Sequence, residues 1–151
     1  MDLNRDILEH NIYFPSRQRQ KTKLLQYKGF SLMKEILIFH VDVNSAYLSW
    51  EAVHQLKNGA STDIRTIPSI IGGDTSLRKG VVLAKSLPAK RFGIHTGEPV
   101  TDALTKCPSL QSFRPNFPLY HKYSKAFISI LKKYAPVVEQ VSIDEAYLDM
   151  S

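Results

Sequence analysis

The chain has 151 residues, 43% hydrophobic and 23% charged, which is typical of one globular domain or of a domain with an inserted lobe. Its apolar runs are far shorter than the roughly 20 residues of a membrane-spanning helix. The sequence therefore excludes such a helix, and no membrane partner is expected. The single cysteine, Cys107, excludes an internal disulfide and a multi-cysteine zinc site. A reducing compartment, and therefore a cytoplasmic location, is expected.

The charges are unevenly distributed. Lys and Arg outnumber Asp and Glu by 20 to 14, and the net charge of +6 permits nucleic acid as a partner. Residues 76–97 carry five basic side chains and no acidic one, whereas residues 134–151 carry four acidic side chains and no basic one. A surface without a binding task would mix the two signs more evenly.

Residues 1–33 show no clear helical or strand period and carry half of the excess positive charge. They also lack the uninterrupted apolar core of a secretory signal. We expect this stretch to be an amino-terminal extension without regular structure. Because Met33 directly precedes the first strong strand pattern, we hypothesise that residues 1–32 lie upstream of the natural start.

Residues 36–43 alternate in the manner of a mostly apolar strand, and this strand ends in a carboxylate, Asp42. On the same strand, His40 is expected to pack beneath the site to which Asp42 belongs rather than to bind metal. A helix follows, with Asn44 expected as its N-cap and Gly59 as its stop.

The middle of the chain contains shorter elements. Two strands are expected at 67–71 and 80–84, separated by a glycine-containing turn, and a short helix is expected at 99–107. A longer helix is predicted over 118–134, because a proline suits its first turn and large apolar residues recur at helical spacing.

Two extended runs, 137–142 and 146–150, flank Asp144 and Glu145 and predict a hairpin with a carboxylate pair near its tip. The order of strand, helix, small insert, helix and hairpin indicates an α+β fold. Its centre is a split βαβ (ferredoxin-like) unit carrying a small inserted α/β subdomain. In such a unit Asp42 can meet the tip of the hairpin.

Three carboxylates brought together in this way would repel one another unless cations neutralised them. Hard oxygen ligands favour Mg²⁺ or Mn²⁺ over zinc, and two such ions about 3.5 to 4 Å apart commonly serve displacement at phosphorus. The pattern alone leaves a second interpretation open, in which Asp42 is a turn residue and the Asp144–Glu145 pair is solvated.

Two motifs resemble a known family. The run HVDVNSAY at 40–47 is similar to the first active-site motif of the Y-family DNA polymerases, the translesion class that includes the DNA polymerase IV enzymes. The run SIDEAYLD at 142–149 is similar to their second motif. Residues 80–94 resemble the fingers segment of the same family, and the resemblance extends over 36–151 in unbroken order.

The resemblance implies an amino-terminal palm and fingers portion. Residues 34–53 and 111–151 would form a partial palm and 54–110 the fingers, with thumb and little finger absent. The implied function is template-directed DNA synthesis past lesions by a DNA-directed DNA polymerase in DNA repair, acting on primer–template DNA and dNTP. The portion alone is expected to polymerise poorly. A sliding clamp would bind through carboxyl-terminal regions that this sequence lacks.

The resemblance also implies a metal site. Asp42 and Asp144 match the two metal-binding aspartates, and the backbone carbonyl of Val43 is a further expected ligand. Glu145 matches the catalytic glutamate, which helps to hold the metal at the primer 3′-hydroxyl. The implied cofactor is a pair of Mg²⁺ ions, with Mn²⁺ as a substitute.

Tyr47 stands five residues after Asp42, where the family places its steric gate, an aromatic ring that collides with a ribose 2′-hydroxyl. Without the motif, core packing on the first helix is the simpler role for Tyr47. The resemblance favours the gate.

The basic segment supplies Lys85, Lys90 and Arg91 as expected nucleotide-binding residues. The sequence departs from the family here, because Leu87 and Lys90 stand where Tyr and Arg are usual. Leu87 cannot donate a hydrogen bond to phosphate, and Lys90 lacks the two-pronged geometry of Arg. A solvated basic face is the alternative.

Two rival functions remain open at this point. One is a non-catalytic polymerase-derived module for DNA binding or regulation, which the altered basic residues favour and the three carboxylates oppose. The other is a nucleotidyl cyclase, since those enzymes use a similar palm with metal carboxylates. The fingers-like segment argues against a cyclase.

Overall fold

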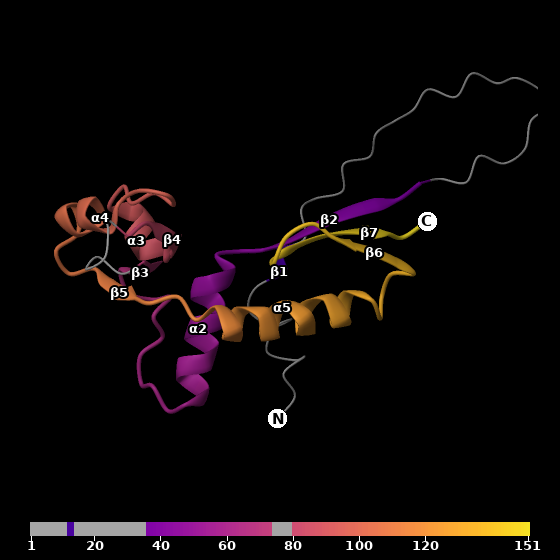
Figure 1. Ribbon diagram of the computed structural model, residues 1–151, viewed down its shortest axis with the longest axis horizontal. Helices are drawn as coiled ribbons and strands as arrows, with labels where there is room; N and C mark the ends of the chain where they lie inside the picture. The colour runs from indigo at the N-terminus through magenta and orange to yellow at the C-terminus, as the bar shows by residue number, and fades with distance from the viewer. Residues whose placement is uncertain (1–11, 14–35, 74–79) are drawn as a thin grey trace, which may run out of the picture.

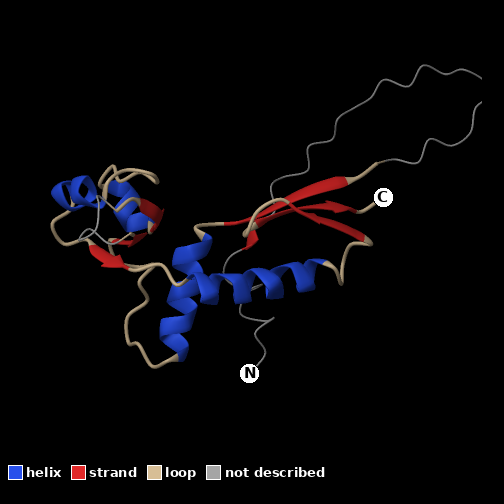
Figure 2. Ribbon diagram, viewed as in Figure 1, coloured by secondary structure: helices blue, strands red, loops and turns tan. Residues whose placement is uncertain are grey.

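The computed structural model describes residues 12–13, 36–73 and 80–151. Figure 1 shows two lobes. The larger sheet, which contains β2 and β7, lies in one lobe, and the smaller sheet, which contains β3, β4 and β5, lies in the other. Helix α2 (Ala46–Lys57) stands between them, and helix α5 (Phe117–Leu131) runs beneath the larger sheet (Figures 1 and 2). The hypothesis about Met33 lies outside the described residues.

The larger sheet has the strand order β1-β2-β7-β6. Strand β2 (Ile38–Val43) pairs antiparallel with β7 (Glu145–Asp149), and β7 pairs antiparallel with β6 (Val137–Gln140). Strands β2 and β6 are therefore parallel, with β7 between them. This topology confirms the predicted split βαβ unit and the predicted hairpin.

Strand β1 (Ile12–Tyr13) lies at the open edge of β2 and pairs with Val43 and Asp42. The sequence predicted no regular structure in this stretch. Two residues are too few for a detectable period, and this strand depends on the hydrogen-bonding groups that an edge strand such as β2 offers.

Helix α2 begins one residue later than expected. Ser45, not Asn44, is its N-cap, and no side chain caps the helix. The expectation for Asn44 was wrong because Ser45 has a left-handed backbone, with φ 47° and ψ 48°, so the helix can begin only after it. Gly59, with φ 91°, follows the end of the helix as predicted.

Helix α5 confirms the predicted amphipathic helix but ends at Leu131. The side chain of Asn116 caps it, accepting a hydrogen bond from the Leu119 amide at 3.2 Å. Its buried face packs against the inward residues of β2 and β7 and against α2, forming the main core. Tyr134, predicted inside the helix, lies beyond its end and is 64% exposed. The buried α5 and strand residues include Tyr120, Tyr123, Phe127, Ile130, Val41, Val43, Ala146 and Leu148.

The smaller lobe contains a three-stranded sheet of order β4-β3-β5. Strands β3 (Ser69–Gly72) and β4 (Val82–Lys85) are the two expected strands, and α4 (Val100–Lys106) is the expected short helix. Helix α3 (Leu87–Arg91) and strand β5 (Gln111–Phe113) were not predicted.

Both unpredicted elements have a physical explanation. Ser86 caps α3 by accepting a hydrogen bond from the Ala89 amide at 3.1 Å, and a proline lies in the first turn. The five-residue helix is too short to show a period. Residues 111–113, assigned from the sequence to the palm, instead pair in parallel with β3 in the smaller sheet.

The smaller lobe has a core of its own, in which Cys107 is fully buried. The backbone of Gly80 passes very close to the backbone of Gly73, next to strand β3. A Cβ on Gly80 would lie 2.5 Å from the carbonyl carbon of Gly73. Only glycine fits there. Among the described residues, no helix is long and apolar enough to cross a membrane.

Candidate active site

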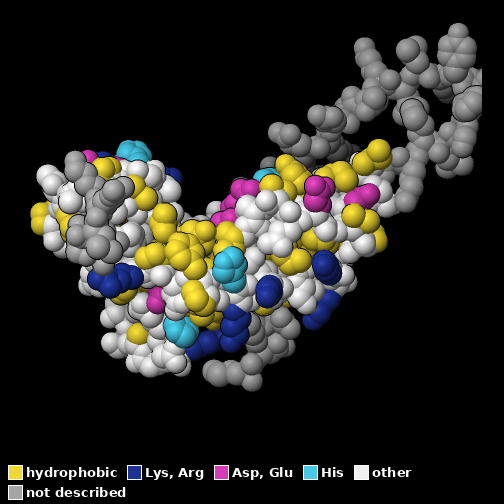
Figure 3. All heavy atoms as spheres, in the orientation of Figure 1, with side chains coloured by type: hydrophobic (Ala, Val, Ile, Leu, Met, Phe, Trp, Pro, Cys, Tyr) yellow, Lys and Arg dark blue, Asp and Glu magenta, His cyan; other side chains and the backbone are white. Residues whose placement is uncertain are grey.

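The paired strands of the larger sheet bring the predicted carboxylates together. Asp42, near the end of β2, lies directly opposite Glu145, the first residue of β7. The Val43 amide donates a hydrogen bond to the Asp144 carbonyl at 3.0 Å, which fixes Asp144 beside the same strand end. Figure 3 shows acidic side chains gathered on the sheet side of the hollow between the two lobes.

These carboxylates repel one another. Partial desolvation raises the pKa of Asp42 above its ordinary value of 3.8, and the charges of Asp144 and Glu145 raise it further. A hydrogen bond with Glu145 acts in the same direction, and only His40 opposes it. A bound cation would relieve this repulsion.

The chemistry of the donors fits a hard cation. Asp42, Asp144 and Glu145 offer carboxylate oxygens, which Mg²⁺ and Mn²⁺ prefer. The Ser142 hydroxyl donates to Asp144 Oδ1 at 2.8 Å and orients this carboxylate. Within the described ranges, no three His, Cys, Asp or Glu side chains are already arranged as a set that could hold a metal ion.

Replacing Asp42 by asparagine is expected to raise the free energy of unfolding at pH 7 in metal-free buffer. The gain should be below about 1 kcal/mol because the side chain is exposed. Folding raises the pKa of Asp42, so the carboxyl stabilises the fold below its ordinary pKa of 3.8 and loses that contribution as the pH rises through the folded pKa.

Urea unfolding of parent and Asp42→Asn at pH 7 and pH 3.5 measures this difference. The difference in the free energy of unfolding between the two proteins should narrow at the lower pH. The Asp42 carboxyl of the parent becomes protonated there and loses its repulsive charge, whereas the amide of the variant does not titrate. A variant less stable than the parent at pH 7 would contradict the repulsion.

Tyr47 lies beside the carboxylates and against an aromatic cluster. Its half-buried ring stacks on Tyr120 with a centroid distance of 4.7 Å and meets Phe117 edge-on at 6.2 Å. Burial raises the pKa of the Tyr47 hydroxyl, and the charge of Asp144 raises it further. Both interpretations of Tyr47, a gate and a packing residue, are compatible with this position.

The predicted basic residues lie in the smaller lobe. Lys85 is half-buried at the end of β4, and its Nζ donates to Thr96 Oγ1 at 3.1 Å. Lys90 and Arg91 are exposed in the last turn of α3. The structure therefore brings Asp42, Asp144, Glu145 and Tyr47 together, while the basic residues belong to another lobe.

The predicted position of His40 was wrong, and the hydrogen bond from Ser142 to Asp144 was not predicted. His40 is exposed, not packed underneath, and its ring stacks on Tyr147 with a centroid distance of 4.7 Å. The two residues are direct cross-strand partners, so only the register of β2 and β7 could reveal the contact. The role of Ser142 has a local signal, because a serine two residues before an aspartate can bond to its side chain.

Comparison with known proteins gives the site its context. The profile of the IMS family, described as impB/mucB/samB, matches residues 41–151. The chain belongs to the impB/mucB/samB family.

Several members and structures resemble the chain. DNA polymerase IV of Clostridium acetobutylicum is 54% identical over 115 residues, covering 76% of this chain and 29% of that protein. DNA polymerase IV 1 of Bacillus subtilis is 39% identical over 118 residues, covering 78% and 27%. The crystal structure of DinB from Sulfolobus solfataricus superposes with a TM-score of 0.66 at 28% identity, covering 76% of this chain and 31% of that one.

A chimera of Y-family DNA polymerases superposes with a TM-score of 0.64 at 26% identity, covering 76% of this chain and 32% of that one. These matches confirm the resemblance to Y-family DNA polymerases and the mixed α+β fold. The impB/mucB/samB chain described here spans less than a third of the length of each of these relatives.

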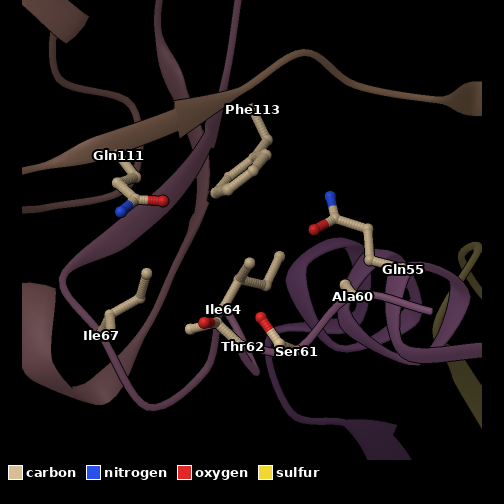
Figure 4. Close-up of a pocket in the computed structure, with 8 residues that line it drawn as sticks. All are labelled: Gln55, Ala60, Ser61, Thr62, Ile64, Ile67, Gln111 and Phe113. Carbon is tan, nitrogen blue, oxygen red and sulfur yellow. The ribbon is translucent and has the colours of Figure 1, made fainter.

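A separate open pocket of about 290 Å³ lies between the loop after α2 and strand β5. Gln55, Ser61, Ile64, Gln111 and Phe113 contribute to its lining (Figure 4). None of the predicted site residues lines it, so this pocket is distinct from the carboxylate site.

Proposed function

We propose that this chain is the amino-terminal palm and fingers portion of a translesion DNA polymerase, with residues 34–53 and 114–151 as palm and 54–113, which include strand β5 of the smaller sheet, as fingers. The function is template-directed DNA synthesis past lesions by two-metal nucleotidyl transfer. The observation that carries the proposal is the pairing of Asp42 with Glu145, beside Asp144, on a split βαβ sheet of a chain related to DNA polymerase IV.

The roles follow from position and charge. Asp42, Asp144 and the Val43 carbonyl would hold Mg²⁺, or Mn²⁺ in its place, and Glu145 would help to hold the ion at the primer 3′-hydroxyl. When bound, two such ions lower the pKa of that hydroxyl and neutralise the triphosphate. Tyr47 excludes the ribose 2′-hydroxyl.

The substrates in this proposal are primer–template DNA and dNTP. Lys85, Lys90 and Arg91 lie in the smaller lobe, and their basic side chains attract the triphosphate of the dNTP. The single, buried cysteine suits work in a reducing cytoplasm. The proposal also includes a sliding clamp as a partner.

Replacing Asp144 by asparagine is expected to weaken Mn²⁺ binding at least about tenfold. Losing a residue that only supports a metal ligand already costs about 10- to 100-fold in affinity, and Asp144 is proposed as a ligand itself. Titration of the whole chain with Mn²⁺, followed by the electron paramagnetic resonance signal of the free ion, measures the affinity. Asp102→Asn is the matched control, because Asp102 is an exposed carboxylate on α4 in the smaller lobe.

The parent and Asp102→Asn should bind Mn²⁺ equally well. A parent chain that binds no Mn²⁺ would contradict the metal site and favour the non-catalytic module. Equal binding by Asp144→Asn and parent, with the same circular dichroism spectrum, would place the ion elsewhere.

A further inference from the structure

The hydroxyl of Ser45 makes an unusual contact. A serine that precedes a helix usually caps it by accepting a hydrogen bond from an amide in the first turn. Helix α2 has no such cap. Instead, Ser45 Oγ donates to the backbone carbonyl of Lys85, 3.2 Å away at the end of β4. This bond joins the larger sheet lobe to the smaller lobe across 40 residues of sequence.

The backbone of Ser45 is held in a conformation that serine rarely adopts. Among the residues that the structure describes, Ser45 is the single non-glycine residue with a positive φ. Such conformations persist where the surroundings over-determine them. The Ser45 carbonyl accepts from the Ser49 amide at 3.0 Å, and Ser49 Oγ donates to the Asn44 carbonyl at 3.0 Å. The backbone bond from the Ser49 amide, which a substitution of the Ser49 side chain keeps, fixes the start of α2 and so the direction of the Ser45 side chain.

Apolar packing also links the lobes, but with less directional control. Helix α2 contacts α5 in one lobe and β3 and β4 in the other, and Figure 1 shows it standing between them. Ile71 and Ala84 of the smaller sheet share the main core with Trp50 of α2. Apolar burial is non-directional, whereas a hydrogen bond requires a particular distance and angle.

We infer that Ser45 is a positioning residue that fixes the orientation of the smaller lobe on the larger one through the Lys85 carbonyl. The Lys85 side chain bonds to Thr96 within the smaller lobe, so it moves with that lobe. On the proposed function, Ser45 therefore sets where Lys85 stands relative to Asp42 and Tyr47, and loss of its hydroxyl weakens nucleotide binding.

Distance measurements between the lobes test the inference without requiring activity. Spin labels are attached at Ser129→Cys on α5 and Thr105→Cys on α4, both exposed positions, while the buried Cys107 stays unlabelled. Double electron–electron resonance then gives the distance distribution in the parent and in Ser45→Ala, Ser45→Gly and Ser49→Ala. The Ser49→Ala control removes a hydroxyl whose bond stays within the larger lobe.

The parent and Ser49→Ala should give one narrow distribution. Ser45→Ala and Ser45→Gly should both populate other distances, since one lost hydrogen bond shifts such an equilibrium on the order of fivefold. Parent-like distributions in both Ser45 variants would overturn the inference. A parent-like Ser45→Gly beside a broadened Ser45→Ala would also overturn it, because backbone strain and not the hydroxyl would then be responsible.

Titration with dATP in the presence of Mn²⁺ adds a functional readout. Ser45→Gly, in which the left-handed backbone costs little, should bind dATP more weakly, on the order of fivefold. A parent that binds no dATP, together with broadened distances in both Ser45 variants, would support the lobe contact and contradict the proposed function.

Discussion

Replacing Phe127 by alanine is expected to lower the free energy of unfolding by about 4 kcal/mol, within the range for large aromatic truncations in a core. Phe127 lies in the middle of α5, has no exposed surface and packs in the main core. The same core includes Ile71 and Ala84 from the smaller lobe. The cavity should therefore destabilise both lobes, and at this magnitude a marginally stable chain would unfold without denaturant.

Urea unfolding followed by the fluorescence of Trp50, the single tryptophan of the chain, measures this loss. Trp50 is 1% exposed and lies in the same core, so its emission reports on that core directly. Phe92→Ala is the matched control, because Phe92 is 48% exposed at the end of α3 and should cost about 0.5 kcal/mol or less. Equal losses in the two variants would show that Phe127 does not anchor the core.

On the proposed function, replacing Tyr47 by alanine is expected to change the selection of deoxyribonucleotides over ribonucleotides on the order of 100-fold, because it removes the ring proposed to exclude a ribose 2′-hydroxyl. The ring of Tyr47 contacts Tyr120 and Phe117, and burial, together with the nearby charge of Asp144, raises the pKa of its hydroxyl. A ring fixed in this way cannot easily turn aside for an added hydroxyl. The measured quantity is the ratio of dATP to ATP affinity with Mn²⁺.

Tyr47→Phe separates the ring from its hydroxyl. If the ring is the gate, the phenylalanine variant should keep the parent's ratio, while the alanine variant should bind the two nucleotides almost equally. The ratio is internal to each protein, so a general loss of stability in Tyr47→Ala does not change it. An unaltered ratio in Tyr47→Ala would leave Tyr47 only the packing role.

Local pattern was enough for the longer elements. The apolar period and Pro118 located α5 to within a few residues, because one helical face must be buried and a proline fits the first turn. The two extended runs around Asp144 and Glu145 located the hairpin of β6 and β7. A short element such as β5 could not be found in this way, because this three-residue strand forms only through its pairing with β3.

The carboxylate site shows the same division. The sequence motifs selected Asp42, Asp144 and Glu145, and the predicted topology placed them at one end of the sheet. The register decided that Asp42 faces Glu145 and that His40 stacks on Tyr147. A shift of one residue would move these side chains to the opposite face, and nothing local in either strand specifies the register of the pair.

The sequence alone thus determined the family, the split βαβ topology and the acidic residues of the candidate site, since motifs and periodic burial are local properties. Tertiary structure alone decided that Ser45 adopts a left-handed backbone and bonds to Lys85, and that Tyr47 rests on Tyr120. Those contacts join residues 40 and 73 positions apart. They form only when the packing of α2 between two lobes has brought distant segments together.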